Sequence, residues 1–267
     1  MTQISILGCG WLGLPLAKAL LKKGFHIKGS TTSMEKIPLL KTVGIEPFII
    51  QLEEEKISES ITDFLADSQI LIVDIPPKLR GNSTENFVAK IATLIPFIKK
   101  ASIEKVLFVS STSVYGEDNE LVTDETPLNP DSEGGRQLAI VESLLQKNNC
   151  FKTTILRFGG LIGEDRNPVR FLSGRENIEN PEAPINLIHQ EDCIGIIKKI
   201  IELDSWNKTY NAVAPFHPTR KEYYTQKAAV LNLALPKFAA SNTIVGKTIL
   251  SDTLMNSLQY SFIKPTL

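Results

Sequence analysis

The feature that most constrains this chain is a glycine-rich run near its N-terminus, Gly8–Gly13, with the pattern Gly-x-Gly-x-x-Gly. The run follows Gln3–Leu7, a short apolar segment typical of a buried strand, and it opens the helical pattern Trp11–Lys23. A strand, a glycine turn and a helix in this order form the context in which the pattern predicts a dinucleotide-binding βαβ unit.

Each glycine of the run has a distinct physical task. Gly8 permits the tight turn, Gly10 lets the backbone approach a pyrophosphate, and Gly13 lets the helix pack closely on the strand. The N-terminus of the helix offers unpaired N–H groups and a partial positive charge. We therefore predict that Gly8, Gly10 and Gly13, with the backbone at Trp11 and Leu12, bind a cofactor. The alternative is a glycine-rich turn without a ligand.

The end of the second predicted strand, Phe25–Gly29, bears on the choice between NAD and NADP. It continues into Ser30–Ser33, where no Asp or Glu is present to bind a ribose 2′-hydroxyl. The hydroxyls of Ser30, Thr31 and Thr32 can instead donate hydrogen bonds to a 2′-phosphate; no Arg is nearby, but Lys36 can contribute a positive charge. The sequence thus favours NADP, with NAD as the alternative. In the competing interpretation these hydroxyls only cap the next helix.

Apolar runs alternate with helical patterns through the first half of the chain, which predicts a parallel sheet with right-handed crossovers. The strands are apolar on consecutive residues, as buried parallel strands are. After the first, the predicted strands are 25–29, 47–52, 69–75, 105–110 and 152–158, and the helices after the first are 34–43, 57–66, 86–101 and 135–147. The expected fold class is α/β: a doubly wound Rossmann domain over residues 1–163, with a small substrate-binding subdomain drawn mainly from residues 164–267 and some segments returning to the main sheet.

The regular alternation of predicted strands and helices ends after Gly163. Asp165–Pro184 is rich in Asn, Pro, Arg, Glu and Gly and is predicted to be loop. A helix over 192–203 is expected with Asp192 as its N-cap, and a strand over 210–213. Thr219 and Glu222 have the spacing of a capping box at the start of a helix over 219–233.

Composition excludes several classes of partner. The net charge is −1 with no basic stripe among the 267 residues, which argues against nucleic acid. Cys9, Cys150 and Cys193 are too few and too far apart for a disulfide framework or a metal site, and they suit a reducing cytoplasm. No apolar run reaches the roughly 18 residues of a membrane span. We expect a small-molecule substrate, and a homodimer is one of the open oligomeric states.

Several motifs occur in an order found in one known family. They are the segments Val109–Gly116, Asp124–Pro127, Pro130–Ser132, Leu156–Gly163, Asn186–Asp192 and Tyr210–Asn211. Together they resemble the extended short-chain dehydrogenases/reductases, the NAD(P)-dependent epimerase/dehydratase family, over nearly the whole chain. The opening Gly-Cys-Gly-Trp-Leu-Gly and the short length are most similar to an atypical, YeeZ-type branch of that family.

The resemblance also implies a departure from the family's chemistry. The family uses a Tyr-x-x-x-Lys pair, in which tyrosine is the general acid/base. Counted from Pro130, Ser132 and the helix residue Glu142, the two positions fall on Gly134 and Leu138, and neither side chain can transfer a proton. Of the family's catalytic hydroxyls only Ser111 remains, and it is the predicted catalytic residue. The competing interpretation of Ser111 is a turn residue at the end of a strand.

Other site residues follow from the resemblance alone. It implies that Pro76 and Pro77, after the fourth strand, and Ser110, at the end of the fifth, lie beside the cofactor. It places Asn167 and His189 toward the substrate. For each of these the alternative is an ordinary structural residue.

Three functions compete on this basis. The first is an NAD(P)-dependent oxidoreductase of the epimerase/dehydratase type acting on a nucleotide-sugar or a smaller hydroxyl or carbonyl compound. The second is a non-catalytic dinucleotide-binding sensor or regulator, which the missing Tyr-x-x-x-Lys pair supports. The third rests on the run Gly13–Ala17, which also resembles nucleotide-sugar 6-dehydrogenases; it requires a nucleophilic cysteine, Cys150 or Cys193.

Overall fold

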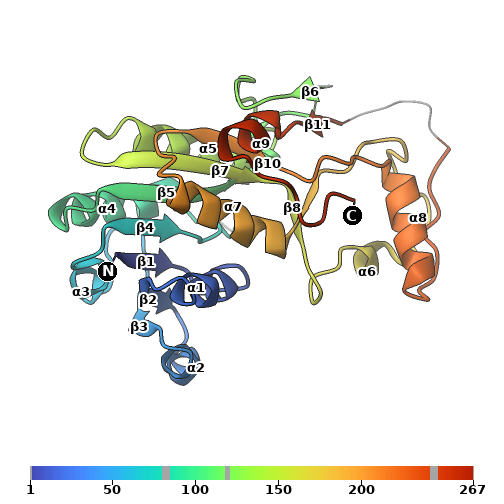
Figure 1. The fold of residues 1–267 in the computed structure, drawn as a ribbon. Helices are drawn as coiled ribbons and strands as arrows, with labels where there is room; N and C mark the ends of the chain where they lie inside the picture. The colour runs from blue at the N-terminus through green and yellow to red at the C-terminus, as the bar shows by residue number, and fades with distance from the viewer. Residues whose placement is uncertain (1, 80–84, 118–120, 241–245, 267) are drawn as a thin grey trace.

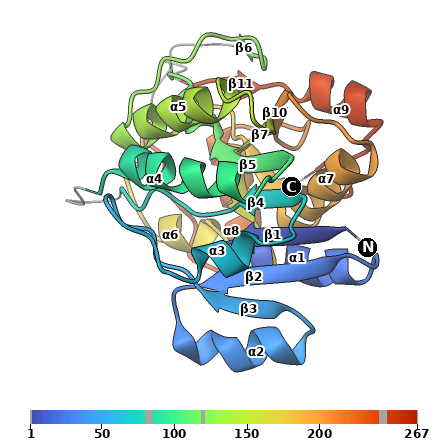
Figure 2. The ribbon, with the colours of Figure 1, turned by 90° about the vertical axis from the view of Figure 1, so that its left-hand side faces the viewer.

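The computed structural model describes residues 2–79, 85–117, 121–240 and 246–266. Within them, a seven-stranded sheet has the order β3-β2-β1-β4-β5-β7-β10, and all of its pairings are parallel. Figure 2 shows these strands stacked from β3 near the bottom to β10 near the top. The strands are β1 (Gln3–Leu7), β2 (His26–Thr31), β3 (Glu46–Ile49), β4 (Ile70–Val73), β5 (Lys105–Ser111), β7 (Lys152–Phe158) and β10 (Thr209–Ala212). The predicted doubly wound α/β fold is confirmed.

Helices cover both faces of this sheet (Figure 1). One face packs on α1 (Gly13–Leu21), α2 (Ile37–Thr42), α7 (Gln190–Glu202) and α9 (Asp252–Leu258). The other packs on α3 (Ile61–Leu65), α4 (Phe87–Lys100) and α5 (Glu133–Gln146). A short 3₁₀ turn, η1 (Met34–Lys36), precedes α2, and another, η2 (Thr112–Val114), follows β5.

The two layers follow from the alternation of side chains along each strand. In β4, Ile70 and Ile72 lie in the cluster with α1 and α7, whereas Leu71 and Val73 lie in the cluster with α3 and α4. All four side chains are buried. Consecutive apolar residues are therefore the pattern that a strand covered on both faces requires, as the sequence indicated.

The second half of the chain differs in several places from its prediction. The segment expected to be loop contains the short helix α6 (Val169–Leu172). The small strands β6 (Leu121–Val122), β8 (Gly160–Ile162), β9 (Leu187–His189) and β11 (Thr248–Ile249) were not predicted, nor was α9. Strands of two or three residues are too short to show a period of two, so no pattern in the sequence predicted them.

The N-cap of α7 also differs from the predicted one. The cap is His189, not Asp192, and the Nδ1 atom of His189 accepts from the N–H of Glu191 at 3.3 Å. The Asp192 carboxylate is fully buried and accepts hydrogen bonds from the Tyr260 hydroxyl, at 2.9 Å, and from the N–H of Ile263, at 2.6 Å. Asp192 therefore anchors the C-terminal segment, a partner that lies too far along the chain for local spacing to reveal.

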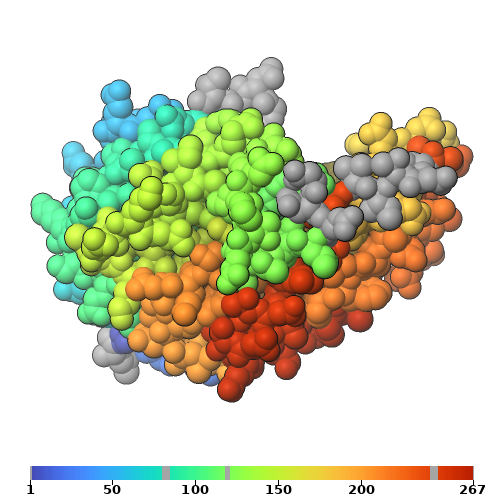
Figure 3. All heavy atoms as spheres, turned by 90° about the horizontal axis from the view of Figure 1, so that it is seen from above, coloured from blue at the N-terminus to red at the C-terminus, as the bar shows by residue number. Residues whose placement is uncertain are grey.

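Two helices lie apart from the main sheet. Figure 1 shows α6 and α8 (Arg220–Val230) at the end of the molecule remote from α3 and α4, beyond β8. The space-filling view shows residues of this part of the chain projecting at one end (Figure 3). The capping box predicted for α8 is confirmed, because the side chains of Thr219 and Glu222 each accept from the other's backbone N–H. In the described part of the chain no helix is long and apolar enough to span a bilayer.

A buried polar network ties α5 to the carboxyl ends of three strands. Arg157 in β7 donates to Glu142 of α5 at 2.7 Å, and the two side chains are 6% and 1% exposed. Arg157 also donates to the Tyr115 hydroxyl at 2.5 Å, and that hydroxyl donates to Asn211 of β10 at 2.8 Å. Ser110 at the end of β5 donates to Glu142 at 2.6 Å. The network fixes the strand ends at which Ser110 and Ser111 lie.

This network yields a stability prediction. The change Glu142→Ala should lower the free energy of unfolding by about 3–5 kcal/mol, because it leaves the Arg157 guanidinium buried without its counter-charge. Urea unfolding followed by circular dichroism measures the change. The matched control is Glu133→Ala on the same helix: Glu133 pairs with Arg136 at the surface, where solvent screens the pair, so this change should lower the free energy of unfolding far less. Equal effects of the two changes would contradict the prediction.

Candidate dinucleotide site

The glycine run forms the loop between β1 and α1, and it is in close contact with the end of β4. Gly8 has a φ of +111°, and a Cβ atom there would lie 2.2 Å from the carbonyl oxygen of Asp74. A Cβ atom on Gly13 would lie 2.1 Å from the carbonyl oxygen of Gly8. Both distances are far below van der Waals contact, so glycine is required at both positions. The loop therefore holds α1 directly against the ends of β1 and β4.

The loop leaves backbone donors available at the start of α1. The N–H of Leu14 bonds to the carbonyl of Gly10, and the N–H of Gly10 to the carbonyl of Gly8. Among the described residues, the N–H groups of Trp11 and Leu12 have no protein acceptor. Two neighbouring free N–H groups at the positive end of a helix suit an anionic oxygen, such as that of a pyrophosphate.

A cavity of about 230 Å³ opens beside this loop at the carboxyl ends of β1, β2 and β4. It brings together Gly8, Gly10, Ser30, Thr31, Thr32 and Pro76 of the predicted cofactor residues. Trp11, Leu12 and Gly13 belong to the same loop without lining the cavity, and Pro77 and Ser110 lie outside its lining. Its other lining residues are Leu7, Cys9, Lys36, Ile50, Leu52, Asp74, Ile75, Lys78, Glu85, Phe87 and Lys90.

The hydroxyls at the end of β2 already make contacts within the protein. Ser30 is buried, its Oγ atom accepts from the N–H of Gly8 at 2.9 Å, and its carbonyl accepts from the N–H of Cys9. Thr31 accepts from the N–H of Ser33 at 3.1 Å. Each hydroxyl retains its proton for donation into the cavity. The side chain of Thr32 is exposed, and Lys36 has no ion-pair partner among the described residues.

Asp74 is the chief residue of this site that sequence reasoning missed. It follows β4, lines the cavity and accepts a hydrogen bond from the N–H of Gly13. Burial raises the pKa of its carboxyl to about 8, although the Gly13 contact acts in the opposite direction. Asp74 is therefore protonated at neutral pH and adds no negative charge beside a pyrophosphate. Its place directly before Ile75-Pro76-Pro77 was the available signal, because the resemblance placed the two prolines beside the cofactor.

The predicted catalytic residue, Ser111, lies farther along the sheet, at the end of β5. The Oγ atom of Ser111 accepts from the N–H of Ser113 and caps η2, so Ser111 has the structural role of a turn residue and keeps its own proton. Gly134 is the second residue of α5, and a Cβ atom there would meet nothing within 4 Å. Leu138 is buried in the apolar cluster of α4 and α5. Neither position of α5 offers a titratable group.

The two predicted substrate residues are engaged in local caps. His189 caps α7, as described above, and its side chain is 16% exposed. Asn167 accepts from the N–H of Val169 at 3.1 Å at the start of α6. These bonds use one atom of each side chain, so both residues retain polar atoms for a ligand. The structure does not bring either of them into the cavity beside the glycine loop.

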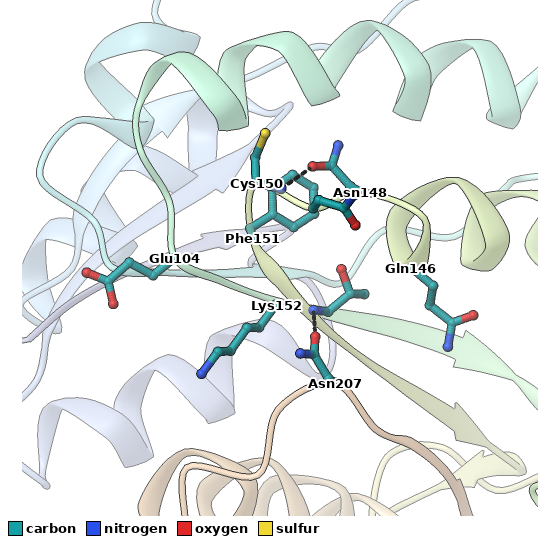
Figure 4. Close-up of a pocket in the computed structure, with 9 residues that line it drawn as sticks. Glu104, Gln146, Asn148, Cys150, Phe151, Lys152 and Asn207 are labelled. Atoms are coloured by element: carbon teal, nitrogen blue, oxygen red, sulfur yellow. Dashed lines mark hydrogen bonds between the residues drawn. The ribbon is translucent and has the colours of Figure 1, made fainter.

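A second hollow, of about 680 Å³, lies at the opposite edge of the sheet. Figure 4 shows Glu104, Lys152 and Asn207 around it, near the amino ends of β5, β7 and β10. In doubly wound sheets ligands bind at the carboxyl ends of the strands, because the crossover loops and helix N-termini gather there. Position in the fold therefore favours the smaller cavity at the glycine loop as the candidate site.

The cysteines do not support a covalent mechanism. Cys193 is fully buried, and burial together with Asp192 and Asp74 raises its pKa well above the usual value. Burial raises the pKa of Cys9 to about 12. Cys150 is exposed at the amino edge of the sheet. None of them is placed as a thiolate nucleophile beside the glycine loop, which weakens the comparison with nucleotide-sugar 6-dehydrogenases.

The raised pKa of Asp74 yields a pH prediction. The folded chain keeps this proton up to about pH 8, whereas the unfolded chain releases it near pH 4. The folded state thus binds more protons between these values, so Asp74 makes the free energy of unfolding fall as pH rises, by up to about 1.4 kcal/mol per pH unit. Asp74→Asn should remove this contribution: little change at pH 4, and higher stability than wild type at pH 8, measured by urea unfolding. A difference that is independent of pH would refute the assignment.

Comparison with known proteins gives a consistent result. Residues 4–189 match the NAD dependent epimerase/dehydratase family. Protein YeeZ of Escherichia coli (strain K12) is 33% identical over 99% of this chain and 97% of its own. D-erythronate dehydrogenase of Cupriavidus necator is 29% identical over 52% of this chain and 47% of its own. The structure of MoeE5 in complex with UDP-glucose and NAD superposes with a TM-score of 0.79 at 16% identity, over 98% of this chain and 93% of that one.

These matches confirm the resemblance found in the ordered motifs and in the opening glycine run. The match to the family covers most of the chain, and the similarity to protein YeeZ covers nearly all of it. The fold and the glycine loop agree with both. The chain belongs to the NAD dependent epimerase/dehydratase family.

Proposed function

We propose that this protein is an NADP(H)-dependent oxidoreductase of the epimerase/dehydratase type. One observation carries the proposal: the glycine loop, the hydroxyls of Ser30, Thr31 and Thr32, and the Lys36 side chain meet in a single cavity. No carboxylate stands at the end of β2, where one would repel a 2′-phosphate. This arrangement favours NADP over NAD.

The residues present fit such a cofactor. The free N–H groups of Trp11 and Leu12 would hold its pyrophosphate, and Ile50, Leu52 and Pro76 supply apolar contact for its adenosine end. Asp74, neutral at pH 7, adds no repulsion. When bound, the nicotinamide supplies hydride transfer, while the protein orients the substrate and manages the proton.

The substrate class follows from the relatives and is part of the proposal. The MoeE5 structure contains a nucleotide-sugar and NAD, and a dehydrogenase of D-erythronate matches half of this chain. We propose that the reacting group is a carbon bearing a hydroxyl or carbonyl group, in a nucleotide-sugar or in a smaller compound.

In this proposal residues 164–267 form most of the substrate-binding part, with Asn167 and His189 as substrate contacts. Pro77 and Ser110 contact the cofactor. The protein acts in the cytoplasm without nucleic-acid or membrane partners, and it forms a homodimer or remains monomeric.

Proton transfer is where this chain departs from its family. With glycine at 134 and leucine at 138, the proton must pass through Ser111, an ordered water or a group of the substrate itself. The Ser111 hydroxyl can donate to a substrate oxygen, because its cap bond uses it only as an acceptor. We propose Ser111 as the catalytic hydroxyl.

A second candidate function is supported by the same two positions. The open space at Gly134 and the apolar surroundings of Leu138 leave a dinucleotide site without an acid/base partner on α5. A protein with these features can report on the cofactor without turning over a substrate. This non-catalytic sensor or regulator is the alternative to the oxidoreductase.

Cofactor choice is tested by titration with NADPH and NADH, followed by nicotinamide fluorescence. Wild type should bind NADPH more tightly, and Lys36→Ala should weaken NADPH about tenfold while leaving NADH unchanged, since one ion contact to the 2′-phosphate is lost. The matched control is Lys41→Ala, an exposed lysine of α2 outside the cavity. Preference for NADH would refute the 2′-phosphate site but not the dinucleotide site. Binding of neither would refute the proposed function.

Catalysis is tested with a panel of sugar nucleotides, sugar acids and small carbonyl compounds. We expect NADP⁺- or NADPH-dependent turnover of at least one compound. Ser111→Ala should lower kcat at least tenfold with the dissociation constant of NADPH unchanged, because in this proposal the lost hydroxyl contacts the substrate and not the cofactor. Ser113→Ala is the control on the adjacent turn. Tight NADPH binding without turnover across the panel would favour the sensor.

A further inference from the structure

We infer that Arg166 binds the diphosphate of the dinucleotide, and that Trp11 positions it. Nothing in the comparisons assigns a role to Arg166, and the sequence pointed only to its neighbour Asn167. The inference rests on the proposed function, because it concerns the same glycine loop. It depends on a contact between that loop and a turn more than 150 residues farther along the chain.

The contact begins with the Trp11 side chain. The indole N–H of Trp11 donates to the Asp165 carboxylate at 2.7 Å. A Cβ atom on Gly163 would lie 2.8 Å from the indole ring, so only glycine allows the turn to approach so closely. Gln190 at the start of α7 donates to the Trp11 carbonyl at 2.7 Å. Two contacts thus hold the turn after β8 against the glycine loop, and a third, from α7, holds the backbone of Trp11.

The turn places the Arg166 guanidinium beside the glycine loop. Gly163 and Arg166 close the turn with backbone bonds of 3.1 and 3.2 Å in opposite directions. The Arg166 guanidinium lies over the Trp11 ring, with its Cζ atom 5.1 Å from the ring centroid. A cation–π contact of this kind orients a guanidinium without using its N–H donors.

Arg166 forms no ion pair with any side chain in the part of the protein that the structure describes. Its side chain is exposed. The carboxylate of the adjacent Asp165 accepts from the Trp11 indole N–H and forms no ion pair with Arg166. Arginine is suited to two phosphate oxygens at once, because its donors form a planar fork. The free N–H groups of Trp11 and Leu12 and the Arg166 guanidinium therefore supply donors from two distant parts of the chain, both at the glycine loop.

The test compares ligands with and without a diphosphate. Arg166→Ala should weaken NADPH binding tenfold or more and reduce its salt dependence, while 2′-AMP, which has the 2′-phosphate but no diphosphate, binds as it does to wild type. Arg166→Lys should recover part of the affinity by restoring the charge. Trp11→Phe, which keeps a ring but loses the bond to Asp165, should fall between wild type and Arg166→Ala. Arg170→Ala, an exposed arginine of α6, is the matched control and should change nothing.

Several outcomes would overturn the inference. Unchanged NADPH affinity in Arg166→Ala would do so, and so would an equal loss of 2′-AMP binding, which would indicate a general distortion of the site. Weaker binding of UDP with unchanged NADPH affinity would move Arg166 to the diphosphate of a nucleotide substrate and refute its role toward the dinucleotide. Failure of the proposed function itself is distinct: wild type would then bind neither NADPH nor 2′-AMP.

Discussion

The site depends on the close approach of three backbone segments: the turn at Gly8, the start of α1 at Gly13 and the carbonyl of Asp74 after β4. No side chain fits between them. This contact sets the height of α1 over the sheet and leaves the N–H groups of Trp11 and Leu12 without an acceptor among the described residues. It also buries the Asp74 carboxyl deeply enough to keep it protonated at neutral pH. The donors proposed to bind an anion at this position are thus a consequence of packing that begins with the absence of two Cβ atoms.

A second constraint acts at the other half of the sheet. The Arg157–Glu142 pair lies within the protein, and its hydrogen bonds extend to Ser110, Tyr115 and Asn211. Through Glu142 the pair fastens α5 to β5 and β7. In the family this helix carries the catalytic tyrosine and lysine. The helix packs against β5 and β7, and its positions 134 and 138 offer no titratable group. Glycine at position 134 and leucine at position 138 of this helix are the reason that both an oxidoreductase and a sensor remain candidates.

Much of the fold was predictable because it is determined locally. The strands β1 and β7 have the predicted bounds, and the capping box of α8 was evident from Thr219 and Glu222. The strands of two or three residues and the role of Asp192 were not predictable, because β6, β11 and the C-terminal segment gain their partners only from distant parts of the chain. In the site, the glycine loop and the β2 hydroxyls came from spacing, whereas Asp74 required knowledge of what surrounds it.

By itself, the amino-acid sequence determined the family, the parallel sheet and the place of the glycine loop. These depend on patterns of apolar residues and glycines that each extend over a short stretch of the chain. Only the tertiary structure decided which groups share a cavity and in which charge state. Lys36 joins Asp74 there, and Arg166 comes to lie over Trp11, across sequence separations that no local pattern spans. The physical reason is that burial and electrostatic contact are properties of neighbours in space, which the folded chain alone defines.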